Sequence, residues 1–211
     1  MDYSGFKCKW IDKNKLRKLA DQIRQEYWPE DILPIDTTKI IELRLKLEVE
    51  PRFDLLSALD MDAYLKTNLR GIVVDHDCYM QDKFANRLRF SLAHELGHYF
   101  LHKDVYSSLP LLSIEDWKDF ILNVPEAEYG NFEWQANEFA GRFLVPYDQL
   151  NLKVAESLEL MRQWDLMEYL QQDPDAVLSR VSPFLRKTFG VSEQVIALRV
   201  RRENLWPPEI R

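Results

Sequence analysis

The sequence predicts an α+β fold that is mostly helical, with a small three-stranded sheet and a helical segment at its C-terminal end. Two observations predict it. Apolar residues recur at intervals of three and four over several long stretches, which is the spacing of one helix face. Short runs that alternate or are wholly apolar, as in strands, lie between residues 45 and 75. With 211 residues the chain can bury a substantial core, as one domain or as one domain with an appendage.

The N-terminal part of the chain predicts two helices and then the sheet. The apolar face of the first helix consists of Leu16, Leu19, Ala20, Ile23 and Tyr27. Asp36 and Thr37 are good N-caps, so a short second helix is expected after them. The expected strands are 45–49, which ends at Pro51, 64–69 and 71–75.

Two longer helices with complementary patterns follow the sheet. Residues 86–102 contain no proline and carry an apolar stripe of Leu88, Leu92, Leu96 and Phe100. Residues 133–146 carry a second stripe of Ala136, Phe139, Ala140 and Phe143. Pro146 closes this helix, and its small residues permit close packing against another element.

The first of these helices contains the motif His94-Glu95-Leu96-Gly97-His98. Four residues advance a helix by roughly 400° and 6 Å, so His94 and His98 share one face and can bind one tetrahedral ion, for which zinc is suited. Glu95 lies roughly 100° around the helix, where it can hold a water molecule at the metal. It is therefore the candidate general base. Gly97, a poor helix former, indicates close approach by another element.

A catalytic zinc site needs a third protein ligand, and three residues are candidates. His102 lies roughly 12 Å further along the helix from His94, so it is expected to orient a ligand or to stay a satisfied surface histidine. Asp104 has no glycine before it to turn the chain back, so it is a minor candidate. Glu133 is the favoured third ligand. Its alternative role is that of an exposed glutamate in the first turn of a helix, where the helix dipole favours a negative charge. Asn137, one turn later, can orient a ligand histidine through its amide oxygen.

Two blocks of this sequence resemble the signature blocks of the ImmA/IrrE metallopeptidase family. The first block is 89–98 with Leu101 and His102, and the second is Glu133, Ala136, Asn137, Phe139, Ala140, Leu144 and Pro146. The similarity runs in order over about residues 36–150. Ser91 and Val145 depart from the usual threonine and methionine, and neither change affects a ligand position.

The resemblance implies a mostly helical, zincin-like core that holds one Zn²⁺. His94, His98 and Glu133 are implied as the metal ligands and Glu95 as the catalytic carboxylate. It also implies a cytosolic zinc-dependent endopeptidase that hydrolyses a peptide bond in a helix-turn-helix transcriptional repressor, or in a similar regulatory partner encoded nearby. A non-proteolytic, zinc-containing interaction module of a repressor or toxin–antitoxin pair is the alternative, with zinc as a structural support.

We expect the chain to divide into a metallopeptidase domain, residues 1–150, and a C-terminal helical segment, residues 151–211. Helices are expected within 158–170, from Asp173-Pro174-Asp175 towards Gly190, and from Ser192 to Arg202. The turn at 188–192 is similar to that of a helix-turn-helix. Residues 176–211 contain seven Arg or Lys and three Glu, so DNA binding through this segment is a further alternative function.

Other residues near the expected site have weaker roles. Tyr106 and Tyr129 are both candidates to donate a hydrogen bond to an oxyanion. The strand 72–75 is a candidate edge that an extended peptide could join. Residues 75–78 contain metal-ligand types but are expected to alternate faces as a polar strand end. Arg142 is expected to form an ion pair at the surface.

Composition favours a soluble protein of the cytoplasm. The formal net charge of -7 does not favour general binding of nucleic acid. An acidic surface could attract a basic protein partner, but solubility explains the charge equally well. Cys8 and Cys78 are the two cysteines and lie far apart. The first ten residues show no apolar signal segment, and we expect neither a disulfide nor a membrane partner.

Overall fold

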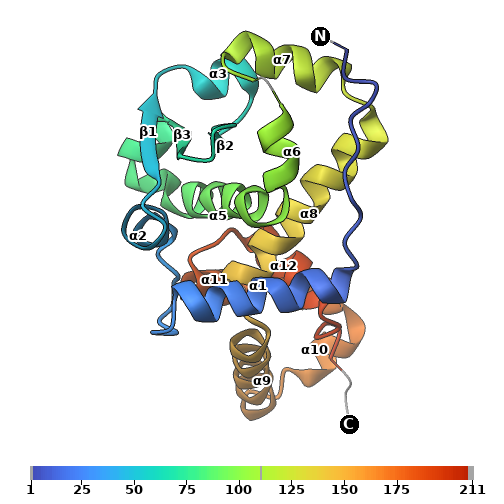
Figure 1. Ribbon diagram of the computed structural model, residues 1–211. Coiled ribbons are helices and arrows are strands. Elements are labelled where there is room, and N and C mark those ends of the chain that lie inside the picture. Colours follow the sequence, from blue (N-terminus) through green and yellow to red (C-terminus); the bar gives the residue numbers. More distant parts are fainter. Residues whose placement is uncertain (1, 110, 209–211) are drawn as a thin grey trace.

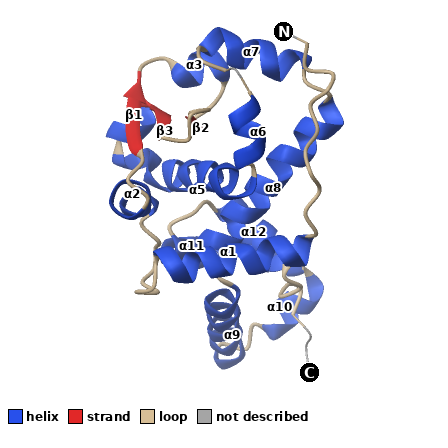
Figure 2. Ribbon diagram, in the orientation of Figure 1, coloured by secondary structure: helices blue, strands red, loops and turns tan. Residues whose placement is uncertain are grey.

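The computed structural model describes residues 2–109 and 111–208, and it has the mostly helical α+β fold that the sequence predicts (Figure 1). Figure 2 shows the strands gathered on one side of an otherwise helical molecule. The N-terminal elements are α1 (Lys13–Tyr27), α2 (Thr37–Lys39), the π-helical turn η1 (Ile40–Arg44), β1 (Glu48–Arg52), α3 (Leu55–Leu59), β2 (Ala63–Leu65), β3 (Gly71–Asp75), α4 (His76–Met80) and the 3-10 turn η2 (Asp82–Phe84).

The rest of the described chain is helical. Its elements are α5 (Ala85–Leu101), α6 (Lys103–Ser108), α7 (Ile114–Asn123), α8 (Glu126–Leu144), α9 (Tyr147–Gln163), α10 (Met167–Gln172), α11 (Pro174–Phe189) and α12 (Glu193–Arg202). The helix that carries the histidine motif is confirmed almost to the residue. The helix expected at 133–146 is α8, which begins seven residues earlier, so Glu133 lies in its middle and not in its first turn.

The sheet has the strand order β1-β3-β2, with β1 parallel and β2 antiparallel to β3. Its first strand lies later than the predicted 45–49 and contains Pro51, which was expected to end it. Proline is tolerated there because β1 is an edge strand, which needs ladder hydrogen bonds on one side only. The expectation that 72–75 forms an edge is also wrong, because β3 is the central strand and β2 occupies the second edge.

The polar stretch after β3 caps a helix. The Asp75 carboxylate accepts hydrogen bonds from the backbone N–H groups of Asp77 and Cys78, at 3.0 and 3.1 Å, and from that of Leu56 at 3.0 Å. Residues 76–78 therefore form the first turn of α4 and do not alternate faces as a strand. Asp75 acts as an N-cap, which explains its acidic side chain without a second metal site.

Helices α5 and α8 cross in close contact at Gly97. A Cβ atom on Gly97 would lie 3.0 Å from both the Cα and the carbonyl oxygen of Ala136, and 3.3 Å from Cδ1 of Phe139. Glycine at this position therefore allows the backbones to approach, as the sequence predicts. The close crossing brings the middle of α8 next to the histidine motif of α5.

The C-terminal helices follow most of the predicted boundaries. Asp173 caps α11 through a 2.9 Å bond from the Ala176 N–H, and Gly190 ends this helix with a left-handed φ of 62°. Ser192 then caps α12. The helix expected within 158–170 is divided into α9 and α10, because Asp165 adopts a left-handed φ of 56° that ends α9.

A single cluster of buried apolar side chains extends through the described chain, from Tyr3 to Trp206. Helix α8 passes through its middle and contacts α1, α5 and α12. The N-terminal segment before α1 runs beside α8, where Lys7 and the backbone N–H of Cys8 both bind the Glu128 carboxylate at 2.9 Å (Figure 1). Among the described residues, none of the helices combines the length and the apolar character that a bilayer crossing requires.

Candidate metal centre

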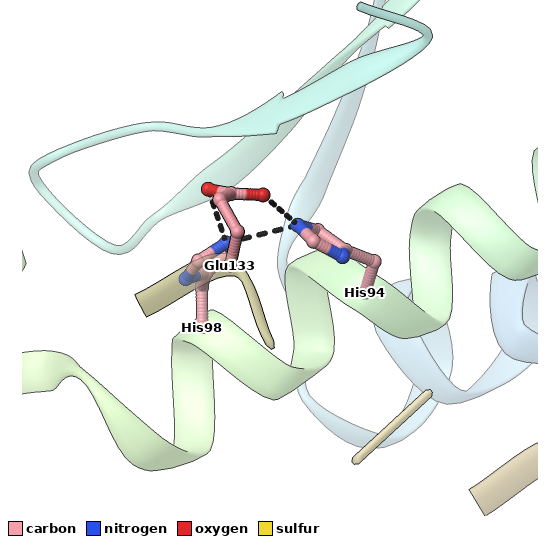
Figure 3. A group of neighbouring side chains, drawn as sticks. All are labelled: His94, His98 and Glu133. Carbon is pink, nitrogen blue, oxygen red and sulfur yellow. Dashed lines mark hydrogen bonds and ion pairs between the residues drawn. The ribbon is translucent and has the colours of Figure 1, made fainter. Parts of the chain in front are cut away.

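Three side chains from α5 and α8 converge on one point. The Nε2 atoms of His94 and His98 are 3.0 Å apart, and the two carboxylate oxygens of Glu133 lie 3.1 Å from the first and 3.5 Å from the second (Figure 3). One potential ligand atom from each residue lies within 4.8 Å of the others. The spacing of four along α5 stacks the two imidazoles, and the crossing of α8 brings the carboxylate opposite them.

Further side chains hold both imidazoles in this orientation. Nδ1 of His94 is 3.1 Å from Oδ1 of Asn137, and Nδ1 of His98 is 3.0 Å from Nδ1 of the buried His102. His102 in turn lies 3.5 Å from Oε1 of Gln135. Because an amide oxygen only accepts, Nδ1 of His94 carries a proton, and Nε2, on the side of the centre, is the atom available to a metal. Asn137 and His102 thus stand where sequence reasoning expected orienting groups.

The charges of the centre are strongly coupled. Burial by itself lowers the pKa of His94, but hydrogen bonding to Glu133 and its negative charge raise that pKa to about 9. Burial lowers the pKa of His98 to about 4, with a further contribution from the charge of His94. Burial opposes ionisation of Glu133, yet hydrogen bonds from the two histidines hold its pKa well below the usual range. Glu133 is therefore ionised, and of the two imidazoles His94 is the one that can carry a balancing positive charge.

This donor set fits a metal ion. Two imidazole nitrogens and one carboxylate oxygen are a ligand set of catalytic zinc sites, in which a fourth position stays open for water or substrate. The remaining nitrogen of His94 is bonded to a neutral acceptor, as is usual for ligand histidines. A cation at this point would supply the positive charge between the three groups.

Glu95 lies next to the centre and is almost fully buried, at 3% exposure. Its carboxylate accepts a 2.7 Å hydrogen bond from the backbone N–H of Leu65 in β2. Burial raises the pKa of Glu95 to about 8, and the negative charge of Glu133 also raises it. A carboxyl group with such a pKa can both take up and release a proton near neutral pH, as a general base must.

An open cleft of about 510 Å³ lies in front of the centre. Its lining includes Leu59, Asp60, Met61, Asp62, Ala63, Phe90, Ser91, His94, Glu95, Ile121, Tyr129, Glu133 and Asn137. Of the two tyrosines that the sequence left open, Tyr129 lines this cleft. Tyr106 is 1% exposed and packs beneath His98, with ring centroids 5.6 Å apart. Only Tyr129 of the pair can therefore meet a bound substrate.

Two residues singled out in the sequence lie away from the centre, and one contact at the centre was not predicted. Asp104 is exposed on α6 and is not in the His94, His98 and Glu133 group. Arg142 does form ion pairs, at 2.6 Å with Asp21 and 3.1 Å with Glu203, but its side chain is only 14% exposed and so lies largely beneath the surface. The contact of Leu65 with Glu95 was not foreseen, because a backbone donor has no signature in the sequence.

Crossed helices that bring two histidines and a glutamate together beside an open cleft define a metallopeptidase-type protein. Comparison with known families agrees, since the model of the IrrE N-terminal-like domain, of peptidase M78, matches residues 79–201. This match covers more than half of the chain, so the chain belongs to that family. The resemblance to the ImmA/IrrE family is thereby confirmed.

Comparison of folds gives a similar picture. A Mycobacterium tuberculosis transcriptional regulator is 19% identical in sequence and aligns with a TM-score of 0.50 over 88% of this chain and 46% of its own. At this identity the likeness concerns the fold alone. The present chain thus spans less than half the length of that regulator. Among curated proteins, none matches this chain.

Proposed function

We propose that the protein is a zinc-dependent endopeptidase that hydrolyses a peptide bond in a helix-turn-helix transcriptional repressor or a similar regulatory partner. The observation that carries this proposal is the convergence of His94, His98 and Glu133 beside the buried Glu95 at the floor of an open cleft. In this proposal the first three residues hold one Zn²⁺ and Glu95 moves protons. Membership of the M78 peptidase family supports the same function.

In the proposed peptide hydrolysis, the zinc ion and the side chains of the protein have different roles. When bound, zinc polarises a carbonyl group and makes water more acidic. Glu95 accepts the proton of the attacking water and delivers it to the leaving amine. The hydrogen bond from Leu65 keeps the Glu95 carboxylate turned towards the cleft. Asn137 and His102 hold the two imidazoles still.

Strand β2 offers an edge along which a substrate can bind. On either side of this strand, the Asp62 carbonyl accepts a hydrogen bond from the Asp75 N–H and the Lys66 N–H donates one to the Gly71 carbonyl, at 2.7 and 2.9 Å, so these two flanking residues face β3. Backbone groups alternate in an antiparallel ladder, so those of Ala63 and Leu65 point away from β3. Ala63 lines the cleft and the Leu65 N–H reaches Glu95. An extended peptide can pair with this edge through main-chain hydrogen bonds, which require no particular sequence.

Tyr129 is the residue best placed to stabilise an oxyanion. It lies one helical turn before Glu133 and lines the cleft together with Glu95. Burial raises the pKa of its phenol, and the charges of Glu133 and Glu95 add to this effect, so it stays a hydrogen-bond donor at neutral pH. A neutral donor that lines the cleft beside the centre is suited to a developing negative charge on oxygen.

The partner and the compartment belong to the same proposal. A helix-turn-helix repressor is what resemblance to the ImmA/IrrE family implies, and one of the solved structures with a similar fold is a transcriptional regulator. Cys8 and Cys78 are both free and buried, which suits a reducing cytoplasm. The formal net charge of -7 is compatible with a basic partner and equally with solubility alone.

A cleavage assay tests this function directly. The zinc-loaded protein is mixed with the helix-turn-helix protein encoded beside its own gene, and products are followed by gel electrophoresis and mass spectrometry. Two defined fragments are expected from the wild type. Glu95→Gln should keep its zinc, measured by elemental analysis, and lose cleavage roughly 10²-fold to 10⁴-fold. Equal cleavage by this variant would sink the assignment of Glu95.

The same assay separates the two alternatives. An intact partner held in a stable complex, with both wild type and Glu95→Gln, would point to the non-proteolytic interaction module. DNA binding through 176–211 has less support, because carboxylates already pair with most of its described basic side chains. These pairs are Arg186–Glu193, Arg199–Glu138, Arg201–Asp175 and Arg202–Glu138. Salt-dependent binding to duplex DNA would revive that alternative.

A further inference from the structure

The cleft at the candidate metal centre continues into a second hollow between α8 and α12. This hollow has a volume of about 360 Å³ and shares Phe90, Glu133 and Asn137 with the cleft. Its other lining residues are Gly130, Trp134, Gly141, Val195, Leu198, Arg199 and Arg202. Because three residues line both cavities, the hollow adjoins the cleft, and a chain bound at the metal would pass beside these residues to reach it.

The hollow offers an apolar surface in spite of its two arginines. Trp134 and Phe90 are half-buried, and Leu198 is 45% exposed although it belongs to a packed helix. The guanidinium groups of Arg199 and Arg202 are held by the fully buried Glu138, at 3.0 and 2.5 Å. Arg199 also pairs with Glu203, so both guanidinium groups are engaged from behind, and aromatic and aliphatic groups remain to meet a ligand.

The outward face of α12 turns towards this hollow. Val195, Leu198 and Arg202 lie at intervals of three and four, so they form one face of the helix. Ile196 and Val200 occupy the opposite, fully buried face. Helix α12 belongs to the segment that the sequence offers as a candidate DNA-binding element. Its accessible side faces the hollow.

We infer that this hollow is a substrate subsite that accepts an apolar side chain, and that Leu198 and Val195 select for it. The inference rests on the proposed peptidase function and adds a specificity to it. Asn137 lies one turn beyond Glu133 and Gly141 a second turn, which is roughly 6 to 12 Å along α8. An extended peptide advances roughly 3.3 Å per residue, so the selected side chain lies about two to four residues from the scissile bond.

A charge placed in the hollow tests the subsite. In Leu198→Arg, a guanidinium group replaces the isobutyl group at the mouth of the hollow. The matched control is Leu160→Arg, because Leu160 is 58% exposed on α9 and lines neither cavity. The substrate is a mixture of decapeptides randomised at every position, and the fragments are sequenced to give the preference at each position.

For the wild type we expect an apolar preference at one position, about two to four residues from the cut. Leu198→Arg should lose this preference and lower kcat/KM for the preferred peptides about tenfold or more, mainly through KM. Its zinc content and melting temperature should match those of Leu160→Arg. Unchanged preference and unchanged kcat/KM in Leu198→Arg would overturn the subsite while leaving the peptidase function intact.

A binding experiment tests the subsite without cleavage. The same decapeptide mixture is passed over immobilised, zinc-loaded Glu95→Gln protein, with and without Leu198→Arg, and the retained peptides are sequenced. We expect an apolar enrichment that the second substitution removes. If the wild type cleaves nothing but this enrichment appears, the peptidase function fails and the hollow stands as a peptide-binding site. No enrichment in either protein would overturn the subsite.

Discussion

At the scale of single residues, Gly97 determines how closely the two halves of the candidate centre approach. His94 and His98 lie on α5 and Glu133 on α8, so their spacing depends on how near the two backbones come. A Cβ at Gly97 would lie 3.0 Å from the backbone of Ala136. Backbone atoms cannot rotate away as a side chain can, so any larger residue must push the helices apart.

We therefore expect Gly97→Ala to damage both stability and metal binding. Overpacking at a helix crossing costs about 1 to 3 kcal/mol of unfolding free energy, and separating Glu133 from the histidines should weaken zinc binding. Denaturant unfolding and zinc titration measure the two effects. Gly130→Ala is the control, because a Cβ there meets nothing within 4 Å and alanine favours a helix by about 0.5 to 1 kcal/mol. Equal behaviour of the two variants would contradict this account.

A second prediction at this scale separates the two tyrosines. Tyr129→Phe should lower kcat about 10²-fold, because one donor to the oxyanion is lost. Its zinc affinity should stay close to that of the wild type if the hydroxyl serves catalysis and does not hold Glu133. Tyr106→Phe removes a hydroxyl that no substrate can reach and should leave kcat unchanged. A loss of zinc affinity in Tyr129→Phe with no separate loss in kcat would argue for a structural role.

At the scale of elements, a buried network of charges joins α1, α8 and α12. Glu138 of α8 has a fully buried side chain and binds Arg17 of α1 at 2.6 Å, Arg199 at 3.0 Å and Arg202 at 2.5 Å. Gly141 makes room for this arrangement, since a Cβ there would lie 3.0 Å from Cδ of Arg199. The network therefore ties three helices together, and Glu138 directly follows Asn137, the residue that orients His94.

Removing the central charge of this network should destabilise the protein. In Glu138→Gln, Arg17 and Arg199 keep only Glu203 and Arg202 loses its carboxylate partner, which costs about 3 kcal/mol or more. Urea unfolding at pH 7 measures the difference. Glu156→Gln is the matched control, because its 2.7 Å pair with Lys153 is half exposed and contributes about 0.5 kcal/mol or less. Similar losses in both variants would refute a central role for Glu138.

We also expect Glu138 to make the stability of the protein depend on pH. Burial by itself raises the pKa of Glu138, but the charges of Arg199 and Arg17 outweigh it and hold that pKa below its usual 4.5. A carboxyl group whose pKa is lower in the folded state stabilises the fold above its unfolded pKa, and the effect is lost as the pH falls below it. Unfolding free energies measured between pH 7 and pH 3 should thus fall more steeply in the wild type than in Glu138→Gln. Parallel curves would contradict this prediction.

Much at the element scale could be predicted from the sequence. Helices α1, α5, α11 and α12 were expected because their apolar residues repeat at helical spacing and their caps are recognisable. The sheet was harder. The sequence places the first strand too early, because Pro51 is expected to end it. A proline interrupts a central strand but is tolerated in an edge strand, and only the pairing of the strands decides that β1 lies at an edge.

At the scale of the whole molecule, α8 is enclosed by segments from both ends of the chain. The N-terminal segment binds Glu128, α1 binds Glu138, and α12 binds Glu138 through Arg199 and Arg202. The division into residues 1–150 and 151–211 stays a prediction. Any such division must cross the ion pairs of Glu138 with Arg199 and Arg202.

Truncation tests how independent the two parts are. We expect a chain ending at residue 150 to be less stable than the full chain by about 3 kcal/mol or more, because Glu138 keeps only one of its three arginine partners. The full chain should unfold in one cooperative transition, followed by circular dichroism in urea. A truncated chain of undiminished stability would show that the C-terminal helices are a separable appendage.

The sequence by itself determined which residues lie on the same face of one helix. His94 and His98 could be paired, and Glu95 set beside them, because helical geometry depends only on hydrogen bonds between near neighbours along the chain. Tertiary structure alone decided how the distant parts meet. The approach of Glu133 to the histidines, the contact of Leu65 with Glu95 and the hollow beneath Leu198 each depend on packing between segments that are far apart in sequence, and that packing leaves no local pattern to read.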